Sequence, residues 1–204
     1  SGGSTPIGLF TEILNQIDKK FEIKSNFFWV DERCVDPSSV DSNFGSANKH
    51  FFSKINISNN NIFRIKGEEK PEIEASNYTK LLKTKTETIK NIPSLDLCLL
   101  GIGDDGHTAS IFPHELKKLS DKTDCVVGIN PDSGQKRVSL SIKQINNSKE
   151  VIFHVCGSGK KDVVDMIISK RDNYLDLPAS HILPKSKNLS WYLDFDSAET
   201  FMGT

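Results

Sequence analysis

The sequence has no long apolar run and no excess of charge of either sign, and each absence excludes a class of protein. No apolar stretch approaches the ~20 residues that a membrane-spanning helix needs, and no charged-then-apolar signal segment opens the chain. Lysine plus arginine (26) nearly balance aspartate plus glutamate (27), which gives a net charge of −1. A nucleic-acid or membrane-surface partner therefore has no electrostatic footprint, and we expect a small-molecule partner instead.

Cysteine is also scarce, and its pattern argues against disulfide frameworks and metal sites. The four cysteines are irregularly spaced and form no C-x-x-C pair. Three of them lie in or beside apolar runs, where a reduced thiol behaves as a small hydrophobe. We therefore expect a reducing, cytoplasmic location. No pair of the five histidines has the spacing of zinc ligands, so the sequence predicts no metal.

The 204 residues suffice for a single domain, 1–204, with a sizeable core. Short apolar runs alternate with helical patterns, which is typical of repeated βα units. The runs predict strands at 27–30, 61–65, 95–102, 125–129, 137–142 and 151–156. The helical patterns predict helices at 6–20, 43–53, 71–90 and 159–169, the first capped by Thr5 and the last by Ser158.

Several of the predicted strands are apolar throughout, as strands buried on both faces are. Segment 137–142 alternates instead and favours an edge or antiparallel strand. The predicted fold is α/β: a Rossmann-like, mostly parallel sheet flanked by helices, with an edge or antiparallel portion.

Four polar or glycine-rich segments are expected to form loops: SGGST at 1–5, DERCVD at 31–36, GDDGHTAS at 103–110 and GSGKK at 157–161. Three follow predicted strands, and parallel strands bring their carboxyl ends to one edge, where ligands bind, so we expect the loops to converge. Glycine-rich turns that open helices attract phosphate through free N–H groups. Together with Arg33, Lys160 and His107, they indicate a phosphorylated small-molecule ligand.

Two nucleotide-binding interpretations of these glycines fail. Gly101, Gly103 and Gly106 satisfy G-x-G-x-x-G, but two acids in the turn would repel a pyrophosphate, and no acid ends the next strand. GSGKK fails the P-loop pattern, because His154 stands where its first glycine belongs and Lys161 where serine or threonine belongs.

Titratable residues in these segments have competing interpretations. His107 stands in a glycine turn beside two acids and a small-residue helix start, which favours a functional role over a structural one. Asp31 and Glu32 fit equally well as helix-capping acids and as a charged loop. His154 lies in an apolar strand and is expected to be a satisfied core residue.

Six motifs lie in order along nearly the whole chain: SGGSTP at 1–6, DERCV at 31–35 with SNFG at 42–45, LGIGDDGHTASIFP at 100–113, KRVSLSIKQIN at 136–146, VCGSGKKDVV at 155–164, and LPASHILP followed by WYLD within 177–194. Together they resemble the 6-phosphogluconolactonases, in the superfamily that also holds glucosamine-6-phosphate isomerases/deaminases. The G-x-G-x-D-G-H-T-A-S pattern followed by Phe-Pro is highly specific.

This resemblance implies a cytosolic enzyme of the oxidative pentose phosphate pathway that hydrolyses 6-phosphoglucono-1,5-lactone without metal or cofactor. By motif position, it implies that His107 is catalytic with Asp105 beside it. The substrate-binding residues that it implies are Ser1, Gly2, Gly3, Ser4, Thr5, Asp31, Arg33, Gly103, Arg137 and Lys160.

These residue types suit the opening of a lactone. An imidazole can take a proton from the attacking water and return it to the leaving ring oxygen. A carboxylate at Asp105 would fix the imidazole tautomer. Backbone N–H groups of the turn from Gly103 to Gly106, or a nearby cation, would stabilise the oxyanion.

The sequence departs from the family in two respects. Members usually carry another residue type at Asp104, so a second acid changes the local charge balance. They also carry a strand and a helix before SGGSTP, so we expect structure upstream of Ser1. Fusion to or association with glucose-6-phosphate dehydrogenase is consistent with that expectation.

Two other functions stay open from sequence alone. A glucosamine-6-phosphate deaminase/isomerase could use Asp31 and Glu32, but its motif needs a glutamate where Phe112 stands, and phenylalanine moves no proton. A non-catalytic sugar-phosphate-binding domain would need the cations but not His107, and usually accompanies a DNA-binding helix-turn-helix.

Overall fold

The computed structural model describes residues 5–18, 21–119 and 122–201. Its α-helices are α1 Thr5–Gln16, α2 Asn43–His50, α3 Pro71–Lys85, α4 Leu116–Leu119, α5 Ile142–Ile145 and α6 Lys161–Ile168. Its strands are β1 Glu22–Ile23, β2 Phe27–Phe28, β3 Asp31–Arg33, β4 Asn56–Ile57, β5 Ile62–Phe63, β6 Glu87–Ile89, β7 Ile92–Ser94, β8 Cys98–Leu100, β9 Val126–Ile129, β10 Lys136–Ser139, β11 Val151–Val155 and β12 Leu189–Leu193. Short 3₁₀ turns lie at Phe52–Lys54, Asn59–Asn61, Pro113–Glu115, Ser158–Lys160, Tyr174–Asp176, Pro178–His181 and Glu199–Phe201.

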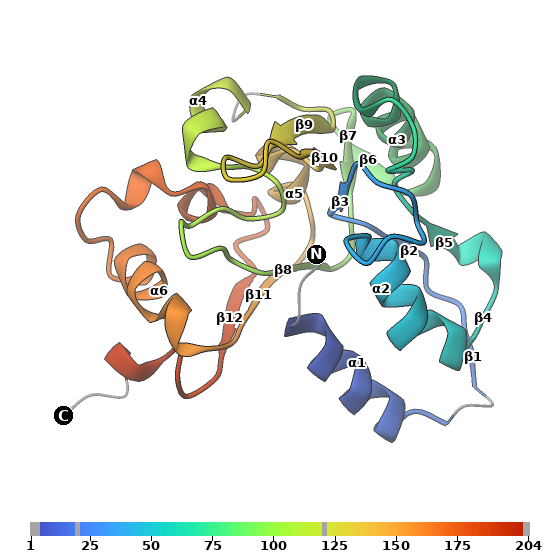
Figure 1. Cartoon of the computed structure of the whole chain (residues 1–204), viewed down its shortest axis with the longest axis horizontal. Coiled ribbons are helices and arrows are strands. Elements are labelled where there is room, and N and C mark those ends of the chain that lie inside the picture. The colour runs from blue at the N-terminus through green and yellow to red at the C-terminus, as the bar shows by residue number, and fades with distance from the viewer. Residues whose placement is uncertain (1–4, 19–20, 120–121, 202–204) are drawn as a thin grey trace.

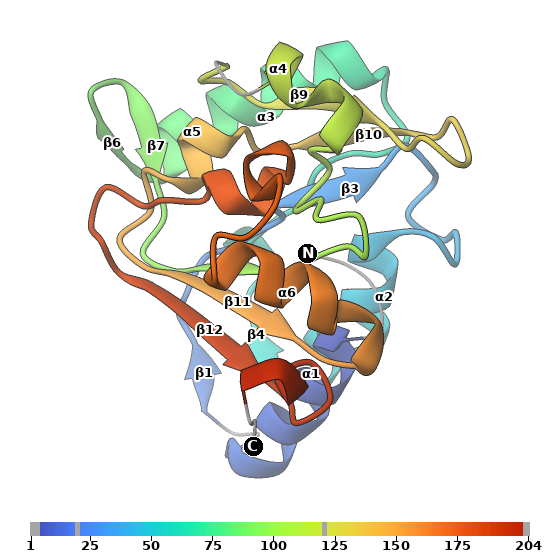
Figure 2. The same ribbon diagram turned by 90° about the vertical axis from the view of Figure 1, so that its left-hand side faces the viewer.

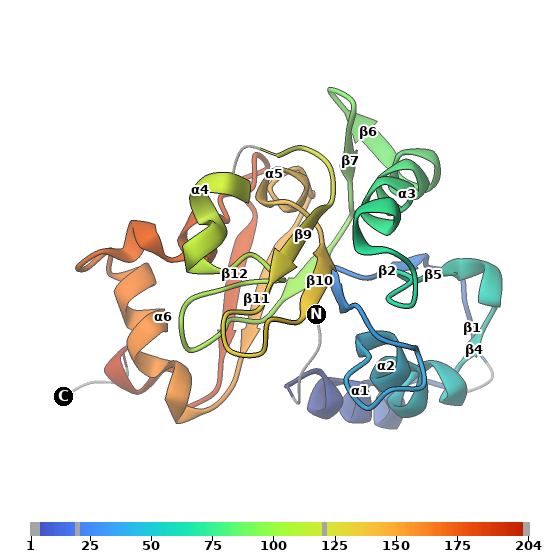
Figure 3. The same ribbon diagram turned by 45° about the horizontal axis from the view of Figure 1, so that its top comes forward.

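The sheets are of two kinds. Strands β12, β11 and β8 lie side by side in parallel, and the pairs β1–β4 and β2–β5 are parallel as well. Strands β3, β10 and β9 run antiparallel, and so does the hairpin β6–β7. Helices lie on either side of the central strands β8, β11 and β12 (Figures 1 and 3). The predicted α/β class, with parallel sheets, flanking helices and an antiparallel portion, is confirmed.

The parallel sheet of β8, β11 and β12 forms one part of the core. Alternate residues of β11 are fully buried, and the Phe153 ring stacks on Trp191 of β12 with centroids 4.1 Å apart. Helix α6 lies over this sheet (Figure 2), and its apolar side chains Val163, Val164 and Ile167 are buried. The helix therefore fixes the position of the turn at its own N-terminus.

Aromatic side chains hold the other half of the core together. Phe10 of α1 stacks on Phe51 at the end of α2, with ring centroids 5.0 Å apart. Phe27 of β2 meets Phe52 edge-on at 5.0 Å, and Trp29 packs on Phe52 at 5.5 Å. These contacts fasten both helices to the β2 strand.

A cavity of about 1550 Å³ lies between the parallel sheet of β8, β11 and β12 and the aromatic cluster of α1, α2 and β2. Phe27 and Phe28 of β2 line one side, and Leu99 and Leu100 of β8 line another. Among the described strands, β2 pairs with β5 alone and β8 pairs with β11 alone, so each has one unpaired edge. The cavity extends to the loop that follows β8.

None of the described helices is long and apolar enough to cross a membrane.

Segment 31–33, predicted as part of a loop, is strand β3. It pairs with β10 in the register Asp31↔Ser139 and Arg33↔Arg137. The alternating segment 137–142 contributes that antiparallel partner, so its antiparallel character is confirmed, although β10 lies between β3 and β9 rather than at an edge. The charged residues of DER are therefore held by a sheet.

The predicted helix over 71–90 is too long. Helix α3 ends at Lys85, and the next residues form the hairpin β6–β7. Thr86, Thr88 and Ile89 are β-branched and favour a strand. Lys90 and Asn91 have φ of 52° and 62°, as the two central residues of a type I′ hairpin turn require.

The two predicted caps are also wrong. Thr5 is itself within α1, and Ser158 lies inside the 3₁₀ turn that precedes α6. Gly157, with φ of 100°, precedes that turn, and no side chain caps either it or α6. Strand β12 was not predicted at all.

The buried Tyr78 hydroxyl provides a test of this packing. The hydroxyl oxygen accepts a hydrogen bond from the Trp29 N–H at 2.7 Å. Its proton has two carbonyl acceptors within reach, that of Trp29 at 3.1 Å and that of Phe63 at 3.0 Å. We expect Tyr78→Phe to lower the free energy of unfolding by about 1–3 kcal/mol, because the Trp29 N–H loses its partner. Urea unfolding measures this. Tyr192→Phe, at a side chain 61% exposed, is the control, and equal losses in both variants would contradict the expectation.

Candidate active site

The loop after β8, residues 101–107, folds back on itself and brings a carboxylate against an imidazole. The Gly103 N–H donates to the His107 carbonyl at 2.8 Å, and the Gly106 N–H donates to the Gly103 carbonyl at 3.0 Å. Oδ1 of Asp105 accepts the His107 backbone N–H at 3.0 Å and lies 2.6 Å from Nδ1 of the same histidine. The predicted pair of Asp105 and His107 is therefore in direct contact.

The charge of Asp105 determines which imidazole nitrogen is available. Burial acts to raise the pKa of Asp105, but hydrogen bonds from the His107 ring and backbone outweigh it and lower the pKa below its ordinary value of 3.8. An ionised carboxylate only accepts hydrogen bonds, so Nδ1 carries the proton and Nε2 of the neutral ring has a free lone pair. The stabilisation from this pair is present at neutral pH and is lost in acid, as the pH falls through that lowered pKa.

Gly103 makes this contact sterically feasible. A Cβ at position 103 would lie 2.0 Å from Nδ1 of His107 and 2.6 Å from Oδ1 of Asp105. At Gly106 the φ angle is 78°, in the region that favours glycine, and an added Cβ would lie 2.8 Å from Leu177. Ala109, just beyond the loop, also has positive φ, at 52°. The backbone here is shaped around the pair at some conformational cost.

Phe112 links the histidine to a cation, a role that sequence reasoning missed. Its ring is buried, with its centroid 4.8 Å from that of His107, and the Arg137 guanidinium lies 5.6 Å from the Phe112 centroid. Phenylalanine's position directly after the GHTASI segment was visible in the sequence. Its contact with a strand some 25 residues later was not.

Arg33 and Arg137 form a pair of like charges on neighbouring strands. They are register partners across β3 and β10, and the Nε of each is buried without a hydrogen-bond partner. Arg33 donates from Nη1 to the Asp41 carbonyl at 2.7 Å. Burial, and then repulsion from Arg33, lower the pKa of Arg137. Two adjacent guanidinium groups with unused donors are an arrangement suited to an anion.

The acids of DER have separate, buried positions. Asp31 is 3% exposed, and its Oδ2 accepts from the Ser110 hydroxyl at 2.8 Å. Glu32 accepts from the backbone N–H groups of Asn43 and Phe44 at 2.7 and 2.8 Å, so it caps α2. Burial raises the pKa of Glu32 despite these bonds. Of its two interpretations, Glu32 therefore fits the helix-capping one, and a substrate-binding role for Asp31 stays a prediction.

Only some of the predicted site residues share the cavity. Thr5, Gly103, His107 and Lys160 all line it, whereas Asp31, Arg33 and Arg137 do not. Lys160 forms an ion pair with Asp104. Ser1, Gly2, Gly3 and Ser4 lie outside the described residues.

The core interpretation of His154 is wrong. The side chain is half-buried and lines the same cavity, with Nε2 3.7 Å from Sγ of Cys156. Across the described ranges, no group of three or more histidine, cysteine, aspartate and glutamate side chains is arranged to hold a metal.

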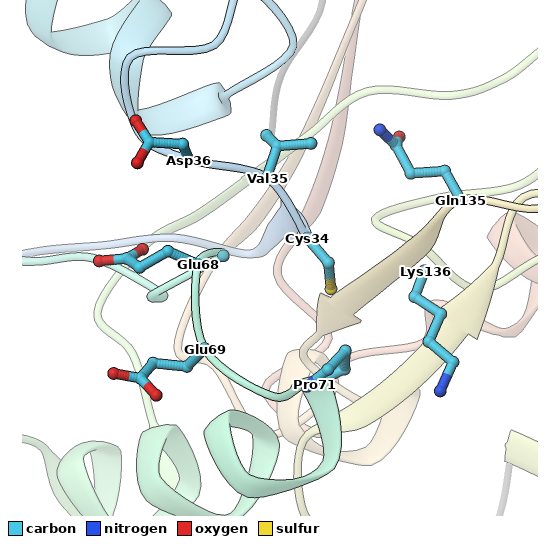
Figure 4. A pocket seen from close by; sticks show the side chains of 9 residues that line it. Cys34, Val35, Asp36, Glu68, Glu69, Pro71, Gln135 and Lys136 are labelled. Carbon is cyan, nitrogen blue, oxygen red and sulfur yellow. The ribbon is translucent and has the colours of Figure 1, made fainter.

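A second, more open pocket of about 630 Å³ lies beside β3 (Figure 4). Cys34, Glu68, Glu69 and Lys136 are among its lining residues. Burial raises the pKa of Cys34 to about 11, so its thiol is protonated at neutral pH and is a poor nucleophile. None of the described residues that line this pocket is a histidine.

Comparison with known proteins finds relatives along nearly the whole chain. The sequence profile of the family described as "Glucosamine-6-phosphate isomerases/6-phosphogluconolactonase" matches residues 1–191. A 6-phosphogluconolactonase of Treponema pallidum is 37% identical over 187 residues, which cover 91% of this chain and 77% of that protein. The human GDH/6PGL endoplasmic bifunctional protein is 32% identical over 200 residues, 97% of this chain but 25% of the larger protein.

A solved structure shows the same fold. The 6-phosphogluconolactonase from Trypanosoma brucei superposes with a TM-score of 0.85 at 29% identity, covering 98% of this chain and 84% of that chain. With the profile match over 191 residues and the similarity to curated relatives, this confirms the resemblance found in the motifs: the chain belongs to the glucosamine-6-phosphate isomerase/6-phosphogluconolactonase family.

Proposed function

We propose that this protein hydrolyses 6-phosphoglucono-1,5-lactone to 6-phosphogluconate. The observation that carries the proposal is the contact between Asp105 and His107, because His107 lines a cavity that Lys160 also lines. The names of the relatives above support the same reaction. The glucosamine-6-phosphate deaminase alternative is not favoured, because the position of its acid is occupied by Phe112, which is buried against the His107 ring.

The reaction needs one group that accepts and returns a proton. The Nε2 lone pair of His107 takes a proton from water as its oxygen bonds to the lactone carbonyl carbon, giving a tetrahedral oxyanion. The intermediate collapses by breaking the bond to the ring oxygen, which receives the proton from the imidazolium. The product acid then ionises to solvent. Asp105 stabilises the transient imidazolium and keeps Nε2 directed away from itself.

The cations are proposed to position the substrate. Lys160 lines the same cavity as Thr5 and Pro6 of α1, and its ammonium group suits a phosphate. Arg33 and Arg137 do not line this cavity, but Arg137 packs on Phe112, which contacts His107. The arginine pair is proposed to supply further donors to the same ligand. Anchoring the phosphate holds the reacting carbon in register, so remote binding energy assists the reaction.

We further propose that residues 1–204 form one lactonase domain, which the family match over 1–191 supports. Association with glucose-6-phosphate dehydrogenase is a proposal that rests on the name of the human bifunctional relative. The cytoplasmic location stays a prediction from cysteine usage.

The catalytic assignment is tested by generating the lactone in situ and following its decay against the uncatalysed rate. We expect His107→Ala to lower kcat by about 10²–10⁴-fold while 6-phosphogluconate still binds, because the proton acceptor alone is removed. Asp105→Asn should lower kcat by about 100-fold or more, since an amide can stabilise the wrong tautomer. Wild-type turnover in His107→Ala would overturn the assignment.

Gly103 and Gly8 provide a test position and its control. Gly103→Ala should lower kcat by about 100-fold, because its Cβ forces the histidine and the carboxylate apart. Gly8→Ala, at an exposed position of α1 that does not line the cavity and where an added Cβ also meets nothing within 4 Å, should retain activity. Circular dichroism checks that both variants fold. Equal activity in the two variants would show that the close contact at position 103 does not matter.

Comparing Lys160→Ala with Lys161→Ala distinguishes a specific contact between Lys160 and the phosphate from a general effect of positive charge. Lys160→Ala should raise the KM for lactone about 10- to 100-fold with a smaller change in kcat, since a charge-assisted contact to phosphate is lost. Lys161, which pairs with Glu199 at 3.0 Å and is 41% exposed, is the control and should change KM less than about twofold. The same rise in KM in both variants would mean that the phosphate binds elsewhere.

A further inference from the structure

The second acid of the catalytic loop is already engaged with the proposed phosphate anchor. Asp104 stands directly before Asp105, yet its carboxylate turns to the other side and pairs with the Lys160 ammonium. A Cβ added to Gly159 would lie 3.7 Å from the same Asp104 oxygen, so that carboxylate rests over the turn between β11 and α6. Within the described part of the chain, it is the one carboxylate that forms an ion pair with Lys160.

The two partners are unequally tied to the protein. The Lys160 side chain is 25% exposed, whereas that of Asp104 is 75% exposed. Asp104 can therefore turn into water at little cost, while Lys160 remains at the cavity. An exposed ion pair is weak, so a ligand that carries more negative charge than one carboxylate can displace it.

We propose that Asp104 is a specificity-determining residue: its carboxylate pairs with Lys160 and is displaced from it by the phosphate of the substrate. This inference rests on the proposed function, because it takes Lys160 as the phosphate anchor. Binding is then a replacement of one anion by another at a single ammonium group. A dianionic phosphate makes that exchange favourable, whereas a neutral or singly charged ligand gains little by it.

The proposal predicts that removing the competing charge tightens binding. Asp104→Asn is expected to lower the KM for 6-phosphogluconolactone, and the Kd for inorganic phosphate measured by calorimetry, about three- to tenfold. The kcat is expected to stay unchanged, because Asp105 and His107 keep their contact. Asp162→Asn, at an exposed residue in the first turn of α6, removes the same charge nearby and should leave both constants unchanged.

A double variant shows whether the effect acts through Lys160. In the Lys160→Ala background, Asp104→Asn should no longer tighten phosphate binding. An unchanged or raised KM in Asp104→Asn, or the same tightening with and without Lys160, would overturn the proposal. Phosphate binding needs no turnover, so an absence of lactone hydrolysis would overturn the proposed function alone, while the calorimetric comparison would still decide the role of Asp104.

Discussion

The contact between Asp105 and His107 depends on the space that Gly103 leaves empty. The turn must be tight enough for the Gly103 N–H to reach the His107 carbonyl, and that same tightness brings the imidazole to within 2.0 Å of where a Cβ would lie. Any side chain would compete for the volume that the hydrogen-bonded pair occupies. Gly103 therefore serves packing around a polar pair, which gives one glycine of the G-x-G-x-x-G pattern a reason that involves no nucleotide.

The buried carboxylate of Glu32 holds strand β3 and helix α2 together. Glu32 binds the first N–H groups of α2 and the N–H of Arg33, so one side chain fixes both a strand and a helix. Hydrogen bonds to backbone N–H groups satisfy donors that a helix end cannot satisfy internally. Arg33 is consequently held in register with Arg137 rather than left on a mobile loop.

Much of the site is local in sequence, and that part was predictable. Asp105 and His107 are two residues apart in a glycine turn, and the family motif implied that both belong to the site. Spacing alone did not show that their side chains touch, which the structure adds. The position of Arg33 was harder, because its register partner lies about a hundred residues away and alternation in 137–142 shows a strand but not its neighbour. The end of α3 was missed for a different reason. Periodicity continued past Lys85, while the turn at Lys90 and Asn91 imposed a hairpin.

Phe112 and Asp104 show what sequence spacing cannot convey. Each contacts a residue of a different element: Phe112 packs against Arg137, and Asp104 pairs with Lys160. Such contacts depend on how the strand ends are placed, which only the assembled fold determines.

The paired guanidinium groups of Arg33 and Arg137 link the stability of the fold to the binding of an anion. Arg33 and Arg137 repel each other, and each has a buried Nε without a partner, so both features oppose the folded state. An anion that satisfies those donors would relieve both costs at once, and a ligand that binds only the folded form raises its stability by mass action. An anion bound by this arginine pair would therefore raise the melting temperature of the protein, and the size of that rise would report how much of the ligand is bound.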